Sequence, residues 1–368
     1  MGRLSLGQMG LLLSSFVWAY ALAQWPAGAL VDRIGPRRLL AGALAVWSAA
    51  QAAAGAAGGL GAFMVARIGL GVGEAPQFPV GARVVRTWFA EQDRGLATGI
   101  FNSASTLGPA LAPPLVTALM LACGWRLAFV AMGLAGIAVS ALWWGLYRDR
   151  PAAAGASAPT PPLTAAAWWR LLASPTLWAM AAGNFGSGFM NWFYAAWLPG
   201  YFEIQRHFSV PKTGWVSAIP FAFGVAGSLI GGALCDRLAR AGLSAIMSRK
   251  APIVGGLLAG ALFTGLASAA RSNAEAIAAI CAAVFFANLA GAAIWALAVA
   301  AAPERAVASV GSVQNFGGLI GGALAPVLTG FSVEATGSFV TAQWATAAVA
   351  GAGALVYLFG VRRPIADP

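Results

Sequence analysis

Apolar residues along this chain gather into runs of about 20 positions, and short polar, charged or Gly/Pro-rich breaks separate the runs. A helix of about 20 residues, rising 1.5 Å per residue, crosses the roughly 30 Å hydrocarbon core of a bilayer. The pattern therefore predicts an all-α membrane protein. We expect eleven spans, at residues 8–31, 39–59, 61–82, 95–121, 125–147, 176–198, 213–235, 252–270, 276–300, 308–331 and 338–361.

Composition supports this pattern and excludes a soluble enzyme. Of the 368 residues, 60% are hydrophobic and only 9% are charged, and the mean hydropathy is +0.76. A net charge of +11 could indicate nucleic-acid binding, but the basic residues lie in short loops between apolar spans rather than on one surface. The three cysteines show no metal or redox spacing, so we expect no disulfide framework, metal site or cofactor.

Loop charge predicts the orientation of the spans. Of the 22 Lys and Arg residues, sixteen fall in or beside loops on one side and five on the other. Because basic loop residues are retained in the cytoplasm, the richer side is expected to be cytoplasmic. This assignment places the C-terminus in the cytoplasm and, with an odd number of spans, the N-terminus outside.

Residues 148–175 form the only long predicted cytoplasmic connection, and their Pro/Ala/Ser composition is typical of a linker. Within this linker, 165–173 contains Trp168, Trp169 and Arg170 and could form a short interfacial helix. We therefore predict an N-terminal bundle of five spans at 1–147 and a C-terminal bundle of six at 176–368.

The two halves repeat one another. Gly28–Arg38 (GALVDRIGPRR) matches Gly232–Gly242 (GALCDRLARAG), with their aspartates 204 positions apart, and the segment Asn102–Pro113 matches Asn315–Pro326 at an offset of 213. Internal duplication across a linker is typical of transporters built from two pseudo-symmetric bundles, with the substrate between them.

The repeat also predicts that one span is missing from this chain. The Asp-Arg motif follows the second span of the C-terminal half but the first span of the N-terminal half. We therefore expect this chain to start at an internal methionine. The complete protein is then expected to have twelve spans with both ends inside the cell.

Several motifs resemble those of known transporters. GALVDRIGPRR resembles the signature between the second and third helices of the major facilitator superfamily, and GALCDRLARAG resembles its weaker second copy. Arg67–Pro79, Thr87-Trp-Phe, Asp93-Arg94-Gly, Gly99–Ser103 and Ala112-Pro-Pro114 resemble motifs of the anion:cation symporter family.

This resemblance implies the major facilitator fold and transport of an organic anion. Members of the family mostly move hexuronates, aldonates, glucarate, phthalate or hydroxyphenylacetate, often with protons. Their first helix carries acidic and basic residues that can join substrate and proton binding, and no counterpart precedes Met1 here. This difference from the family concerns the residues that would couple transport to an ion.

Arg67 and Glu74 are the charged residues placed well inside a predicted span. Seven positions apart, they share a helix face about 10 Å apart along the axis. A charge at this depth needs an interior face, water or a partner. We predict that Arg67 binds a substrate carboxylate and that Glu74 carries the coupling proton. The alternative is a structural ion pair or bonds to neighbouring helices.

Polar side chains in other spans could complete a binding cavity for a hydroxylated acid. Tyr20 and Gln24 lie four apart on one helical face, and the resemblance favours the cavity for them. The alternative is that these groups hold helices together. The further predicted substrate contacts are Asn102, Ser103, Ser105, Asn191, Gln314 and Asn315.

The charged repeat loops are interpreted as gating pairs on the cytoplasmic face, which must break when the bundles move. Solvated loop charges are the alternative. The predicted gating residues are Asp32, Arg33, Arg37, Arg38, Asp236 and Arg237.

Together these features predict a secondary active transporter of a bacterial inner membrane, acting as a monomer. It would import a sugar acid such as a hexuronate, aldonate or glucarate by symport with protons rather than sodium. No ATP-binding motif or catalytic grouping is present in the sequence, so an ion gradient is the expected energy source and no enzymatic activity is expected. The alternatives are an aromatic or dicarboxylic acid transporter and a truncated, non-transporting membrane protein.

Overall fold

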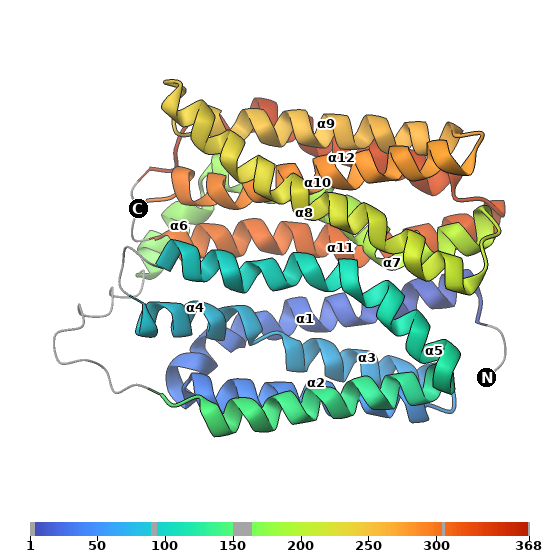
Figure 1. The fold of residues 1–368 in the computed structure, drawn as a ribbon. Coiled ribbons are helices and arrows are strands. Elements are labelled where there is room, and N and C mark those ends of the chain that lie inside the picture. Colours follow the sequence, from blue (N-terminus) through green and yellow to red (C-terminus); the bar gives the residue numbers. More distant parts are fainter. Residues whose placement is uncertain (1–3, 90–93, 150–163, 304–305, 367–368) are drawn as a thin grey trace. The chain divides into compact units, whose positions relative to one another are not determined.

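The computed structural model describes residues 4–89, 94–149, 164–303 and 306–366 (Figure 1). Within those ranges the structure describes the backbone but not the side chains of some helical residues. These are residues 25, 28, 29, 32, 86, 94–106, 165 and 308.

Helices account for all the regular elements among the described residues. In chain order the elements of the first half are α1 (Leu6–Ile34), α2 (Pro36–Ala56), α3 (Leu60–Glu74), α4 (Gln77–Trp88) and α5 (Arg94–Leu146). Those of the second half are α6 (Ala165–Leu172), α7 (Pro175–Gly200), the short π-helix η2 (Tyr201–Gln205), α8 (Val210–Arg240), α9 (Met247–Ala269), α10 (Asn273–Ala301), α11 (Val307–Thr336) and α12 (Val340–Gly360). The predicted all-helical fold class is confirmed.

Long apolar helices recur along the chain, as a multi-pass membrane protein requires. Among the described residues, eight segments are long and apolar enough to cross a bilayer, and they lie in α1, α2, α5 and α8 to α12. The segment in α5, Leu107–Leu146, is 40 residues long and covers parts of two predicted spans. The predicted spans at 61–82 and 176–198 coincide with α3 plus α4 and with α7, which fall outside those eight segments.

The structure differs from the predicted spans at two points where a helix breaks or bends. The predicted span 61–82 is interrupted, because α3 ends at Glu74 and α4 begins at Gln77 after Pro76. A proline has no N–H to continue the helical hydrogen bonds, which accounts for the break. The predicted break between 121 and 125 is a kink in α5 at Gly124, whose φ of 77° suits glycine.

The chain divides into two compact units, Met1–Ala158 and Pro159–Pro368. In the first unit α3 packs against both α1 and α2, and α2 also runs alongside α5 (Figure 1). Glycines allow these approaches. A Cβ at Gly71 would lie 2.9 Å from the Tyr20 backbone nitrogen, and one at Gly73 would lie 2.7 Å from that of Trp47. The faces of α3 are therefore fixed against α1 and α2 at backbone contact distance.

In the second unit the main packing pairs are α7 with α11 and α12, α8 with α10, and α9 with α10 and α12. Glycines again set the distances, as in membrane bundles generally. Gly231 of α8 meets the Leu289 backbone of α10, and Gly321 of α11 meets that of Phe185 in α7. Buried apolar side chains such as Leu257 and Tyr357 fill the space between the helices.

The short helix predicted at 165–173 is present as α6, with Thr164 as its N-cap. Leu171 is 1% exposed, whereas Trp169 on the same helix is 74% exposed. Leu171 thus packs into the core of the second unit, and the indole of Trp169 is exposed on another face of α6. Its location at a membrane interface stays a prediction.

Adjacent glycines of α8 give a matched test of close packing. A Cβ at Gly231 would lie 2.9 Å from the Leu289 Cα, whereas one at Gly232 would meet nothing within 4 Å. We expect Gly231→Ala to destabilise the protein by about 1–3 kcal/mol, because the added methyl group overpacks the helix pair. Gly232→Ala should leave the melting temperature in detergent within about 1 °C of the parent. Equal melting temperatures for the two variants would contradict the packing described here.

Candidate functional site

Four of the predicted site residues lie on neighbouring helices of the first unit. Tyr20 and Gln24 belong to α1, Arg67 and Glu74 belong to α3, and the two helices pack directly against each other. The Gln24 amide donates to the Tyr20 hydroxyl oxygen at 3.3 Å. All four side chains are partly buried. The structure thus brings the predicted cation, carboxyl, phenol and amide to one pair of helices.

Glu74 is the electrostatic centre of this group. Its carboxyl interacts electrostatically with the Arg67 guanidinium and with the Tyr20 phenol. The Arg67 Nε is buried and has no hydrogen-bond partner among the described residues. A buried N–H without a partner is costly, and a carboxylate would satisfy it.

Phe16 is a member of this site that the sequence did not single out. Its ring stacks on Tyr20 with centroids 6.0 Å apart, and the Arg67 Cζ lies 5.0 Å from the Phe16 centroid. Phe16 is four residues before Tyr20, so the i, i+4 spacing was the available signal. In the sequence alone, an aromatic residue in an apolar span indicates ordinary packing. Only the structure places the Phe16 ring beside the Arg67 guanidinium.

The chemistry available at this α1–α3 site is recognition of an anion and storage of a proton. A guanidinium offers a planar fork of donors that matches a carboxylate. Glu74 can be ionised or protonated, and the Tyr20 hydroxyl and Gln24 amide can both donate and accept. The described residues contain no group of His, Cys, Asp or Glu that could hold a metal ion.

The polar cluster predicted on α5 is only partly described. Asn102, Ser103 and Ser105 belong to the helical run Arg94–Leu146, but their side chains lie outside the described residues. Their contact with a substrate stays a prediction.

The predicted residues of the second unit are placed on α7 and α11. Gln314 is 1% exposed, and its amide donates to the Ile294 carbonyl of α10 at 3.1 Å. The Asn184 amide of α7 donates to the Gln314 backbone carbonyl at 2.9 Å. Asn191 donates to Ser187 within its own helix at 3.0 Å, and Asn315 is partly buried. These contacts favour a helix-bridging role for Gln314, and its role in binding is untested.

The predicted gating residues are mostly exposed. Arg33, Arg38, Asp236 and Arg237 have exposed side chains, and that of Asp32 lies outside the description. The Arg37 side chain is hydrogen-bonded to the Trp144 carbonyl of its own unit, a contact that the sequence did not indicate. The gating role of the predicted residues stays a prediction.

Arg37 joins the start of α2 to the end of α5. Its side chain donates to the Trp144 carbonyl from Nε at 3.1 Å and from Nη2 at 2.7 Å, and its Cζ lies 4.4 Å from the Trp144 ring centroid. The Asp149 carboxylate accepts from the Arg37 backbone N–H at 3.1 Å. An acidic group at a helix N-terminus is favourable, so Asp149 also stabilises the start of α2.

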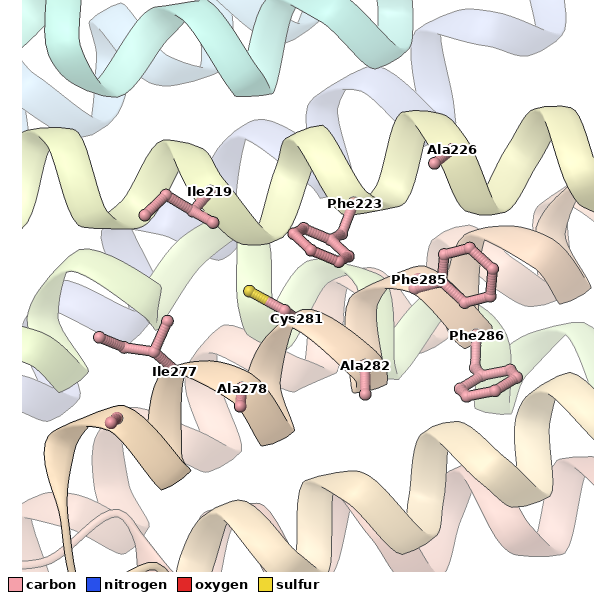
Figure 2. Close-up of a pocket in the computed structure, with 10 residues that line it drawn as sticks. Ile219, Phe223, Ala226, Ile277, Ala278, Cys281, Ala282, Phe285 and Phe286 are labelled. Atoms are coloured by element: carbon pink, nitrogen blue, oxygen red, sulfur yellow. The ribbon is translucent and has the colours of Figure 1, made fainter.

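A groove of about 800 Å³ in the second unit is a separate feature (Figure 2). Phe223 of α8 and Cys281 and Phe285 of α10 lie around it, as Figure 2 shows, together with other apolar side chains. Its lining offers no charged or amide group, so it lacks the donors that a sugar acid requires.

Comparison with known sequences decides the family. The sequence pattern of the Major Facilitator Superfamily matches residues 3–326. The chain belongs to this superfamily. Membership makes it a multi-pass membrane transporter, and it confirms the resemblance drawn from the GALVDRIGPRR motif.

Similar proteins from this superfamily are named as sugar-acid transporters. The chain is 41% identical over 377 residues to a probable L-galactonate transporter of Escherichia coli K12, covering 99% of this chain and 83% of that protein. It is 31% identical to the probable galactarate/D-glucarate transporter GarP of the same organism, covering 98% and 87%. It is 30% identical to the hexuronate transporter of Bacillus subtilis 168, covering 99% and 88%.

Solved structures support the fold. The inward-facing, occupied crystal structure of a bacterial homolog to the human lysosomal transporter Spinster matches with a TM-score of 0.81 at 20% identity. The match covers 97% of this chain and 89% of that one. The major facilitator fold that the resemblance implies is therefore confirmed.

The contacts of Gln314 predict a structural effect of its removal. We expect Gln314→Leu to lower the free energy of unfolding in detergent by roughly 0.6–1.7 kcal/mol, because a hydrogen bond between helices is lost. Asn191→Leu is the matched control and should cost less, because the hydrogen bond from its amide to the Ser187 carbonyl stays within α7. A Gln314→Leu variant of unchanged stability that no longer binds substrate would instead identify Gln314 as a substrate ligand.

Proposed function

We propose that this transporter imports a sugar acid together with protons, with Arg67 binding the substrate carboxylate and Glu74 carrying the proton. The observation that carries the proposal is the α1–α3 site, where Arg67, Glu74 and Tyr20 interact in the first unit. The names of the relatives support a sugar acid as the substrate, since they include galactonate, glucarate and hexuronate transporters.

The charges of the site explain selectivity for an anion. The Arg67 guanidinium retains an unpartnered buried Nε among the described residues, and a bidentate carboxylate satisfies such a donor. Tyr20 and Gln24 supply groups suited to hydroxyls of the same ligand. Asn102, Ser103, Ser105, Asn191, Gln314 and Asn315 are proposed as further contacts.

Competition for Arg67 gives a physical route to proton coupling. When Glu74 is ionised, its charge compensates that of Arg67 and disfavours a second carboxylate beside it. When Glu74 is protonated, the uncompensated guanidinium attracts the substrate anion. Proton and anion then bind as a neutral pair, which lowers the cost of enclosing the loaded site away from water while the bundles move.

The remaining features of the proposal concern the whole molecule. We place the chain as a monomer in a bacterial inner membrane, with its C-terminus in the cytoplasm. The bundles 1–147 and 176–368, joined by the linker 148–175, alternate access to the substrate. The gating charges, including Asp32 and Asp236, hold the closed side until the bundles move.

Uptake into proteoliposomes tests the proposal. Purified protein is supplied with labelled L-galactonate, D-galactonate, D-glucarate or a hexuronate, with and without an inward proton gradient. We expect one of these acids to accumulate only with the gradient. Arg67→Ala should weaken its binding about 10- to 100-fold, the worth of a charged hydrogen-bonded pair. Glu74→Gln should preserve exchange of substrate for substrate while losing accumulation.

Lys212→Ala is the matched control, since it removes an exposed cation far along the chain from the α1–α3 site. Sulfoacetate is included because a probable sulfoacetate transporter of Cupriavidus necator is 30% identical over 97% of this chain. Accumulation of sulfoacetate alone would replace the sugar acid as substrate. Tight binding by Arg67→Ala, or gradient-driven accumulation by Glu74→Gln, would contradict the assigned roles.

A further inference from the structure

The Arg67 Cζ lies over the Phe16 ring, 5.0 Å from the ring centroid. Phe16 is 8% exposed and comes from α1, whereas Arg67 comes from α3. Gly71, one turn after Arg67, packs against the backbone of Phe16 and Tyr20. The ring and the guanidinium therefore lie beside a close backbone approach of the two helices.

A guanidinium is planar, and its faces and its edges make different interactions. Its faces stack on aromatic rings, and its edges donate hydrogen bonds in the plane of the group. A ring beside the guanidinium is at most a weak acceptor of its N–H groups, so these donors remain for a ligand. The buried Arg67 Nε has no partner among the described residues. Phe16 thus replaces water beside Arg67 without taking a strong hydrogen bond from it.

We propose that Phe16 is a positioning residue, which orients the Arg67 guanidinium so that its donors meet the substrate carboxylate. This inference rests on the proposed function. Because Phe16 acts through Arg67, its loss should weaken ground-state binding of the anion more than it slows the movement of the loaded protein.

The test compares side chains that keep or remove the ring. Phe16→Leu and Phe16→Met retain an apolar side chain but lose the π face, and we expect the KM for the accumulated sugar acid to rise about 10-fold with kcat within twofold. Phe16→Tyr keeps the ring and should restore the parent KM. Phe63→Leu in α3 is the control, since that ring packs edge-on against Phe129.

An unchanged KM in both ring-less variants, or a Phe16→Tyr variant as weak as Phe16→Leu, would overturn the role of Phe16. If both ring-less variants fail to fold while Phe16→Tyr folds, Phe16 is a structural residue and the inference also fails. Intact binding by Arg67→Ala in the same assay would instead refute the proposed function itself.

A second inference comes from the internal repeat and does not depend on the substrate. The two halves do not keep one offset, because the Asp-Arg motifs lie 204 positions apart and the asparagines Asn102 and Asn315 lie 213 apart. Arg37 is the second residue of α2, and Lys250 lies in the first turn of α9. A cation thus lies in the first turn of the helix that follows the Asp-Arg motif in each unit, and an offset of 213 relates the two cations.

The two cations make equivalent contacts. Lys250 is 9% exposed, and its Nζ donates to the carbonyls of Leu358 and Val361 at 2.9 Å each, at the end of α12. Arg37 donates twice to the Trp144 carbonyl, near the end of α5. Shifted by 213, Trp144 falls at position 357, next to Leu358.

The last carbonyls of a helix have no partner within the helix and carry a partial negative charge. A cation from another helix therefore satisfies them and neutralises that charge. In each unit the acceptor helix is the last long helix, α5 in the first and α12 in the second. The residues that the contact joins are more than 100 positions apart in the chain.

The geometry points to a duplicated cation clamp, Arg37 in one unit and Lys250 in the other, which fastens the last helix of each bundle. Each bundle can then move as one body, because its closing helix is tied to an earlier one. This assigns Arg37 a contact inside its own unit, in addition to any part in gating.

Hydrogen exchange read along the sequence tests the clamp locally. In Lys250→Met we expect exchange at the end of α12, including the Val361 amide bonded to Tyr357, to accelerate about 10-fold or more. The end of α5 should not change. Arg37→Met should give the reciprocal result, with acceleration at the Tyr147 amide bonded to Trp143.

Lys250→Arg restores a cation and should return exchange toward the parent rate. Arg249→Met is the matched control, since Arg249 bonds to Ala245 and Ser248 in its own turn. Unchanged exchange at both helix ends would overturn the clamp, as would equal acceleration in Arg249→Met and Lys250→Met. If one variant does not fold, the other unit still decides the result.

Discussion

A charge placed at the depth of lipid chains must meet something other than lipid, and the α1–α3 site follows from that requirement. An arginine at the centre of a spanning helix costs roughly 2.5–3.5 kcal/mol on insertion scales, before any compensation. Here Glu74 offsets the charge of Arg67, and the Phe16 ring lies beside the guanidinium. The compensation is incomplete, since the Arg67 Nε has no partner among the described residues. That remaining donor is what a substrate anion would satisfy.

Small residues determine where this group lies. Apolar side chains gain little by leaving lipid, so helix pairs in a membrane depend on close van der Waals contact. Gly71 and Gly73 bring α3 against the backbones of α1 and α2, and this approach sets Arg67 beside Phe16. The second unit uses the same device at Gly231. Basic side chains then hold helix ends, as Arg37 and Lys250 do.

Much of the fold could be predicted from the sequence, because hydrocarbon thickness fixes helix length and the duplicated motifs reveal the repeat. The short α6 could be located from its tryptophans. Partners of side chains could not be predicted. For Phe16, only its spacing of four residues to Tyr20 could have indicated a place in the site. A sequence pattern does not show that Arg37 binds the backbone carbonyl of Trp144. Gln314 is a predicted substrate contact whose amide also bonds the Ile294 carbonyl of α10, and a sequence does not distinguish these two uses of an amide.

The central claim is that the guanidinium of Arg67 receives an anionic substrate while Glu74 lies beside it. A structure of the protein determined with a bound sugar acid tests this claim most directly. We predict carboxylate oxygens within about 3 Å of the Arg67 donors, with the Phe16 ring still beside the guanidinium. An acid bound elsewhere, with Arg67 and Glu74 sealed together in a dry contact or turned toward lipid, would contradict the account.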